Sequence, residues 1–172
     1  MPESRREAGE AVRFAADRML GRLARWLRIL GHDVAYGPHL RGRALVGCAR
    51  QDGRLLLTRD TRLLRQRDLP PHLFIESDHF REQLQQVAAA VPLGGPRLLH
   101  RCLDCNAVLA EAPRERVRER VPAFVWQTAE RFLACPRCRR IYWPATHRTH
   151  MLRELAALGI PGGYPTVLES PA

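Results

Sequence analysis

The 172-residue sequence contains no lysine, few aromatic residues and no long apolar run. No apolar stretch approaches the roughly 18 residues that a membrane-spanning helix needs. The residues that follow Met1 are polar and do not form the apolar segment of a secretory signal. With 45% hydrophobic and 27% charged residues, the chain has the composition of a folded protein. We therefore expect a soluble, cytoplasmic protein with no membrane partner.

Positive charge is in excess and unevenly distributed. The net charge is +10, and all 28 basic residues are arginine. The segment from Arg13 to Arg67 contains thirteen arginines, four aspartates and no glutamate, so it alone carries a net charge of +9. A surface of this kind favours polyanions, and nucleic acid is the leading candidate. The alternative is a solvated basic surface with no partner.

Four of the five cysteines form two Cys-x-x-Cys pairs that are separated by 29 residues. Thiols are expected to be reduced in the cytoplasm, so we do not expect a disulfide framework. Two such pairs supply four thiolates for one tetrahedral ion, and zinc is the expected metal. A redox role for the pairs is the alternative. Because four protein ligands leave no open coordination position, the zinc would be structural. The four predicted ligands are Cys102, Cys105, Cys135 and Cys138, whereas Cys48 is predicted to be buried in a helix.

Strand and helix patterns alternate four times in the first half of the chain. This alternation predicts an α/β fold with a doubly wound parallel sheet and helices on both faces. The predicted strands cover residues 12–16, 33–36, 54–58 and 73–75, and the predicted helices cover 18–30, 40–51, 62–66 and 79–90. The expected organisation is a flexible arm at 1–11, an α/β domain at 12–93, a zinc ribbon with a terminal helix at 98–158, and a flexible tail at 159–172.

Three of the predicted strands end in an aspartate. In open α/β sheets, ligands bind outside the carboxyl ends of the strands, and Asp17, Asp60 and Asp78 follow three of those ends. Carboxylates brought together there would favour a hard divalent cation such as Mg²⁺ or Mn²⁺. The alternative for each residue is a helix cap.

Other residues carry weaker signals. His147 and His150 have a spacing that could coordinate a metal, but four thiolates already satisfy zinc, so surface or capping roles are favoured. Trp126, Tyr142 and Trp143 could stack on bases, although in so small a module they more readily supply its core.

Several segments together resemble a known family. They are Phe14-Ala-Ala-Asp17, Met19 to Gly31, Leu56-Leu-Thr-Arg-Asp60, Glu76-Ser-Asp78, Cys102 to Asn106, and Cys135 to Trp143. In this order they resemble the PIN-like ribonuclease domain found at the C-terminus of the Mut-seven exonuclease and in free-standing prokaryotic proteins. The resemblance covers about residues 12–158. It implies a PIN fold with a fused zinc ribbon, and it matches Asp17, Asp60 and Asp78 to the metal-binding acids of a Mg²⁺- or Mn²⁺-dependent ribonuclease.

One segment departs from that pattern. Members of the family carry an acidic cluster at the start of the second helix, whereas here the segment reads His39-Leu-Arg-Gly-Arg-Ala44. Arginine cannot replace a carboxylate as a metal ligand. Either three acids suffice, with Asp33 or water completing the shell, or the chain binds RNA and cuts it poorly.

Three functions follow. The first is a metal-dependent ribonuclease whose substrate phosphates are held by Arg18, Arg22, Arg25 and Arg59. The second is an RNA-binding protein, for example on ribosomal or structured RNA, that has lost turnover. In the third, the zinc ribbon docks a protein partner.

Overall fold

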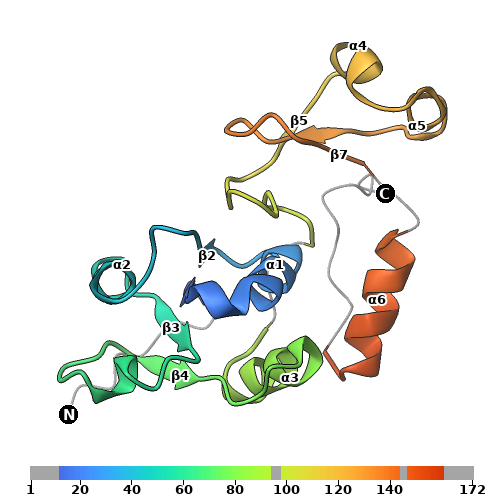
Figure 1. Ribbon diagram of the computed structural model, residues 1–172. Coiled ribbons are helices and arrows are strands. Elements are labelled where there is room, and N and C mark those ends of the chain that lie inside the picture. The colour runs from blue at the N-terminus through green and yellow to red at the C-terminus, as the bar shows by residue number, and fades with distance from the viewer. Residues whose placement is uncertain (1–11, 94–97, 144–146, 161–172) are drawn as a thin grey trace.

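The computed structural model of the protein describes residues 12–93, 98–143 and 147–160. The predicted flexible arm at 1–11 and most of the predicted tail, at 161–172, lie outside the described residues. Figure 1 shows an α/β unit in the lower part of the view and a smaller cysteine-containing unit above it. The elements of the first unit are β1 (Phe14–Ala16), η1 (Arg18–Leu20), α1 (Gly21–Ile29), β2 (Val34–Ala35), α2 (Arg43–Gln51), β3 (Leu55–Thr58), η2 (Leu63–Arg65), β4 (His72–Phe74) and α3 (Phe80–Ala90).

A four-stranded sheet organises the first unit. All its strand pairs are parallel, and the strand order is β2-β1-β3-β4. The central strand β3, Leu-Leu-Leu-Thr, is buried along its whole length, as expected for a parallel strand that is covered on both faces. The predicted parallel sheet is therefore confirmed.

Alternating side chains divide the core into two layers. Phe14, Ala16 and Leu57 contribute to the larger hydrophobic cluster, which contains the buried faces of α1 and α3. Ala15 and Leu56 point to the opposite face and pack with α2. Successive strand residues point to opposite sides of a sheet, so helices cover both faces and the sheet is doubly wound, as predicted.

Helix α1 buries one apolar face, but not every arginine of the helix is exposed. Leu23 and Leu27 are fully buried, and Gly31, at φ 89°, adopts the left-handed conformation that ends the helix. Helical periodicity places Arg28 on the polar side of α1, yet only 2% of it is exposed. The polar side of α1 is covered there by the second unit, which the periodicity of a single helix does not reveal.

The second unit contains a three-stranded antiparallel sheet with strand order β5-β6-β7. The spacer between its two cysteine pairs contains strands β5 and β6, which pair antiparallel, with short helices between them. Val117, Val121 and Phe132 form a small core within the spacer. Trp126 and Trp143 pack against this core, which favours the core role predicted for them. The elements are β5 (Ala110–Glu111), α4 (Arg114–Val117), η3 (Arg118–Arg120), α5 (Ala123–Thr128), β6 (Leu133–Ala134) and β7 (Ile141–Tyr142).

The terminal helix α6 (His147–Ala157) packs against the first unit. Leu155 is fully buried in the larger cluster of the α/β unit, and Arg81 of α3 donates two 2.9 Å hydrogen bonds to Glu154. Figure 1 shows α6 beside α3. The helix that the sequence grouped with the zinc ribbon therefore shares the core of the α/β unit. None of the helices in the described ranges is long and apolar enough to cross a membrane.

Candidate functional site

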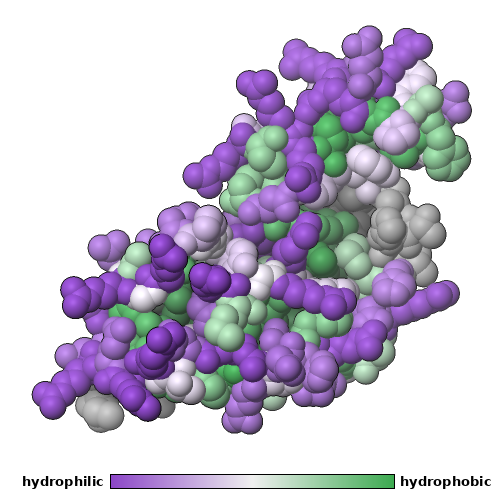
Figure 2. Space-filling view, viewed as in Figure 1, coloured by the Kyte–Doolittle hydropathy of each residue, from purple (hydrophilic) through white to green (hydrophobic). Residues whose placement is uncertain are grey.

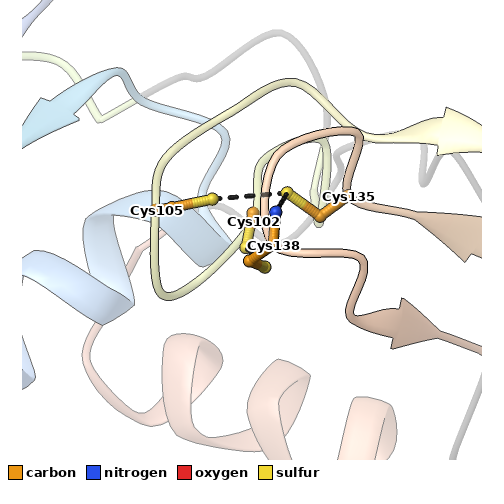
Figure 3. Close-up of side chains that lie close together, drawn as sticks. All are labelled: Cys102, Cys105, Cys135 and Cys138. Carbon is orange, nitrogen blue, oxygen red and sulfur yellow. Dashed lines mark hydrogen bonds between the residues drawn. The ribbon is translucent and has the colours of Figure 1, made fainter.

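The four predicted zinc ligands converge on one point. The Sγ atoms of Cys102, Cys105, Cys135 and Cys138 all lie within 4.8 Å of one another, and Figure 3 shows two loops that each contribute one Cys-x-x-Cys pair. In the part of the chain that the structure describes, this is the only group of three or more His, Cys, Asp or Glu side chains with such spacing. Four soft sulfur donors fit a tetrahedral zinc ion.

The two cysteine loops have the same backbone design. The N–H of Asn106 donates to the carbonyl of Cys102, and the N–H of Arg139 donates to the carbonyl of Cys135, both at 2.9 Å. Asn106 and Arg139 both have positive φ, at 66° and 62°. Each loop therefore closes in a tight turn that points two sulfurs in one direction.

The thiols differ in acidity because their hydrogen bonds differ. Burial raises the pKa of Cys102, but hydrogen bonds from the Tyr142 hydroxyl and from nearby backbone amides outweigh it and lower that pKa to about 6. Burial, together with the neighbouring sulfurs, raises the pKa of Cys105 to about 12. Four adjacent thiols cannot all ionise without a cation, so the cluster suits a metal ion that neutralises four thiolates.

The first cysteine loop is attached to the α/β unit by Arg28. Its guanidinium donates to the carbonyls of Leu103 and Asp104 at 2.8 and 2.9 Å, and to the carbonyl of Val34 at 2.8 Å. Burial lowers the pKa of Arg28, and nearby Cys102, Cys105 and acidic groups oppose that effect. A single buried side chain thus joins α1, β2 and the metal-binding loop.

Asn106 makes a second connection. Its side-chain oxygen accepts the N–H of Val34 at 3.0 Å, and its Nδ2 donates to Asp33 at 2.7 Å. Arg54 also donates to Asp33, at 2.6 Å. Because Asp33 precedes β2, it lies at the amino edge of the parallel sheet. Asp33 therefore cannot complete the metal shell at the opposite, carboxyl edge of the sheet. The hypothesis that it joins Asp17, Asp60 and Asp78 there is wrong.

Asp17 lies at the carboxyl edge and is only 6% exposed. Its carboxylate accepts the hydroxyl of Thr58 at 2.7 Å and the N–H of Arg59 at 2.6 Å, both on Oδ2. Its Oδ1 accepts the N–H of Met19 at 2.8 Å, so Asp17 does cap the first helical turn. Asp17 accepts three hydrogen bonds, and a carboxylate has about four lone-pair sites, so one remains that could bind a cation.

Thr58 links Asp17 to Asp60. The same Thr58 hydroxyl that donates to Asp17 accepts the N–H of Asp60 at 3.0 Å. The Asp60 carboxylate is 39% exposed and accepts the N–H of Arg62 at 2.9 Å through Oδ1. Thr58 carries no metal-ligand pattern in the sequence, although its position at the end of the most apolar strand is a usable signal.

Asp78 lies on the surface. Its side chain is 80% exposed and is 3.6 Å from the imidazole of His79. The three predicted acids follow three strands of one sheet, but among the described residues their carboxylates do not form a group placed to hold a metal ion. A shared ion would therefore require these side chains to come closer together.

The predicted RNA-binding arginines have different surroundings. Arg18 and Arg22 are exposed at the start of the first helical segment, and Arg25 is 3.4 Å from Asp104 of the cysteine loop. The Nη1 atom of Arg59 is buried without a hydrogen-bond partner among the described residues. Figure 2 shows hydrophilic side chains over most of the visible face. The exposed arginines keep this part of the surface basic.

The comparisons with known proteins give one result. No curated protein and no solved structure matches the chain. A family model described as the Mut7-C RNAse domain matches residues 12–155, which include the parallel sheet, the three aspartates and all four clustered cysteines. The chain therefore belongs to the Mut7-C RNAse domain family.

Proposed function

We propose that the protein is a PIN-like ribonuclease that uses Mg²⁺ or Mn²⁺ to cleave RNA phosphodiester bonds. Asp17 and Asp60 would hold the metal, with Asp78 as a third ligand. The observation that carries the proposal is the arrangement of Asp17, Thr58 and Asp60 at the carboxyl edge of the sheet, where one hydroxyl contacts both acidic residues. Membership of an RNase domain family supports the same conclusion.

The proposed site has the donor chemistry of a hard cation. Carboxylate oxygens are the preferred ligands of Mg²⁺ and Mn²⁺, and a bound ion would supply a Lewis acid for phosphodiester hydrolysis. The chain's own contribution is to fix the Asp17 carboxylate by three hydrogen bonds. Arg18, Arg22, Arg25 and Arg59 would hold the substrate.

The four cysteines would bind a structural zinc ion in a zinc ribbon. Four thiolates leave no open position for substrate. The contacts of Arg28 and Asn106 support a role for this ribbon in fixing the second unit against α1 and β2. We further propose that the α/β domain spans residues 12–93 and the ribbon 98–143, with α6 completing the core of the former.

A second candidate function is RNA binding without turnover. Arg41 and Arg43 stand at the start of α2, where the family that the chain resembles carries acids. In the described residues, Asp17, Asp60 and Asp78 do not form a group placed to hold a metal ion. Salt-sensitive RNA affinity that needs no added divalent ion is the expected signature of this function.

The test is cleavage of labelled single-stranded and structured RNA with Mg²⁺, with Mn²⁺ or with no added ion. Asp17→Asn and Asp60→Asn should each abolish metal-dependent cleavage. Asp68→Asn is the matched control, because Asp68 is exposed on the loop before β4 and asparagine tolerates its positive φ of 62°. Thermal melting verifies that each variant is folded.

Cleavage by both site variants at the wild-type rate would contradict the metal site. RNA binding with no cleavage by the wild-type protein would instead favour the second function.

A further inference from the structure

A pocket of about 620 Å³ opens where α1 and α3 begin. Met19 and Arg22 line it from the first helical segment, and Asp78, Phe80 and Arg81 line it from the start of α3. The backbone N–H of Met19 donates to Asp17, so the pocket adjoins the proposed catalytic edge. A substrate bound at Asp17 would therefore pass close to it.

The pocket wall contains a stack of planar groups. The rings of Trp26 and Phe80 are nearly parallel, with centroids 5.7 Å apart and an interplanar angle of 21°. The guanidinium carbon of Arg22 lies 3.8 Å from the centroid of Phe80. A guanidinium is planar and has two faces. Arg22 packs against Phe80 and is nevertheless exposed, so part of its planar surface is open to a further planar group.

The charges around the pocket differ in their availability. Arg81 is held by two hydrogen bonds to Glu154, and His79 is 3.6 Å from Asp78. Arg22 also interacts electrostatically with Glu154, and it contributes to lowering the pKa of that carboxyl. Among the described residues, however, no carboxylate forms a close ion pair with Arg22, and its side chain is exposed, so it remains accessible to a ligand.

Met19 adds an apolar contact at the same place. It is 61% exposed, which makes it one of the most exposed large apolar side chains in the described residues. A site for phosphate alone would need only cationic and polar groups. An exposed methionine beside a stacked arginine instead matches the flat, apolar and polarisable face of a nucleobase.

We infer that this pocket binds one unpaired base of the RNA substrate, next to the phosphate at Asp17 and Asp60. The base stacks on Arg22 and contacts Met19, and the Phe80–Trp26 pair holds the Arg22 guanidinium in place. Bases in a duplex have both faces covered by their neighbours, so the pocket selects single-stranded RNA. This inference rests on the proposed RNA function but not on cleavage.

The test compares the affinity of the protein for a short oligoadenylate with its affinity for an abasic oligonucleotide of the same length. Fluorescence anisotropy measures both affinities without added divalent ions. Arg22→Lys keeps the positive charge and removes the planar group, and Met19→Ser removes the apolar contact. Both residues are exposed, so neither change should unfold the protein. Arg65→Lys, at an exposed arginine outside the pocket, is the control.

The wild-type protein should bind the oligoadenylate more tightly than the abasic chain. Arg22→Lys should weaken oligoadenylate binding by about fivefold or more, the order expected when one stacked base is lost, and should leave abasic binding unchanged. Met19→Ser should act in the same direction, and Arg65→Lys should have no effect.

Two outcomes would overturn the inference. Equal wild-type affinity for the two oligonucleotides would show that the pocket recognises no base. An equal loss for both oligonucleotides in Arg22→Lys would assign Arg22 to a phosphate contact. Neither outcome bears on metal-dependent cleavage, which is measured separately with the Asp17 and Asp60 variants.

Discussion

Arg28→Met tests whether one buried arginine holds the two units together. The change removes donors to the carbonyls of Val34, Leu103 and Asp104, while methionine retains much of the apolar part of the side chain. A buried acceptor that loses its partner costs about 1–3 kcal/mol. Because such losses are not additive, we expect the free energy of unfolding to fall by about 3–5 kcal/mol. That is a large part of the ~5–15 kcal/mol available to a typical domain.

Arg25→Met is the matched control for this prediction. Arg25 lies on the same helix and is 3.4 Å from Asp104, but its side chain is 55% exposed. An exposed ion pair contributes at most about 1 kcal/mol, so the control should remain near wild-type stability.

Two measurements check the Arg28 prediction. Urea denaturation gives the free energy of unfolding, and the rate of zinc transfer to a chromogenic chelator reports on the cysteine loop. We expect faster zinc release from Arg28→Met than from Arg25→Met. A loss of less than about 1 kcal/mol, with an unchanged release rate, would refute the reasoning.

Three further predictions concern the metal cluster, the carboxylate edge and the core. Cys135→Ser should reduce bound zinc measured by elemental analysis, whereas Cys48→Ser should not, because Cys48 lies outside the cluster; equal zinc in both variants would contradict the four-thiolate site. Thr58→Val should raise the Mg²⁺ concentration needed for cleavage, since it removes the hydroxyl that donates a hydrogen bond to Asp17. Thr58→Ser keeps a hydroxyl and should need the same Mg²⁺ concentration as the wild type. Leu56→Ala should lower the free energy of unfolding by about 2–5 kcal/mol, as Leu56 is fully buried under α2; a urea midpoint close to that of the wild type would argue against the two-layer core.

Local patterns were sufficient to predict the sheet and the thiolate cluster. The strand β3 was recognised because a nearly continuous apolar run indicates burial on both faces, and the structure confirms that burial. The cysteine pairs were recognised from their Cys-x-x-Cys spacing, and hydrogen bonds within a few residues close each turn. Such features depend on near neighbours in the chain, so their residues alone carry the signal.

Contacts between distant segments had to be seen in the tertiary structure. Arg28 donates hydrogen bonds to carbonyls about 75 positions further along the chain. Thr58 can donate to Asp17 only because β3 lies beside β1. The positions of Asp17, Asp60 and Asp78 at strand ends were readable in the sequence, but whether their oxygens converge depends on side-chain directions that strand position does not specify. The sequence thus determined which thiols, carboxylates and arginines this protein carries, and the packing of remote segments decided which of them meet.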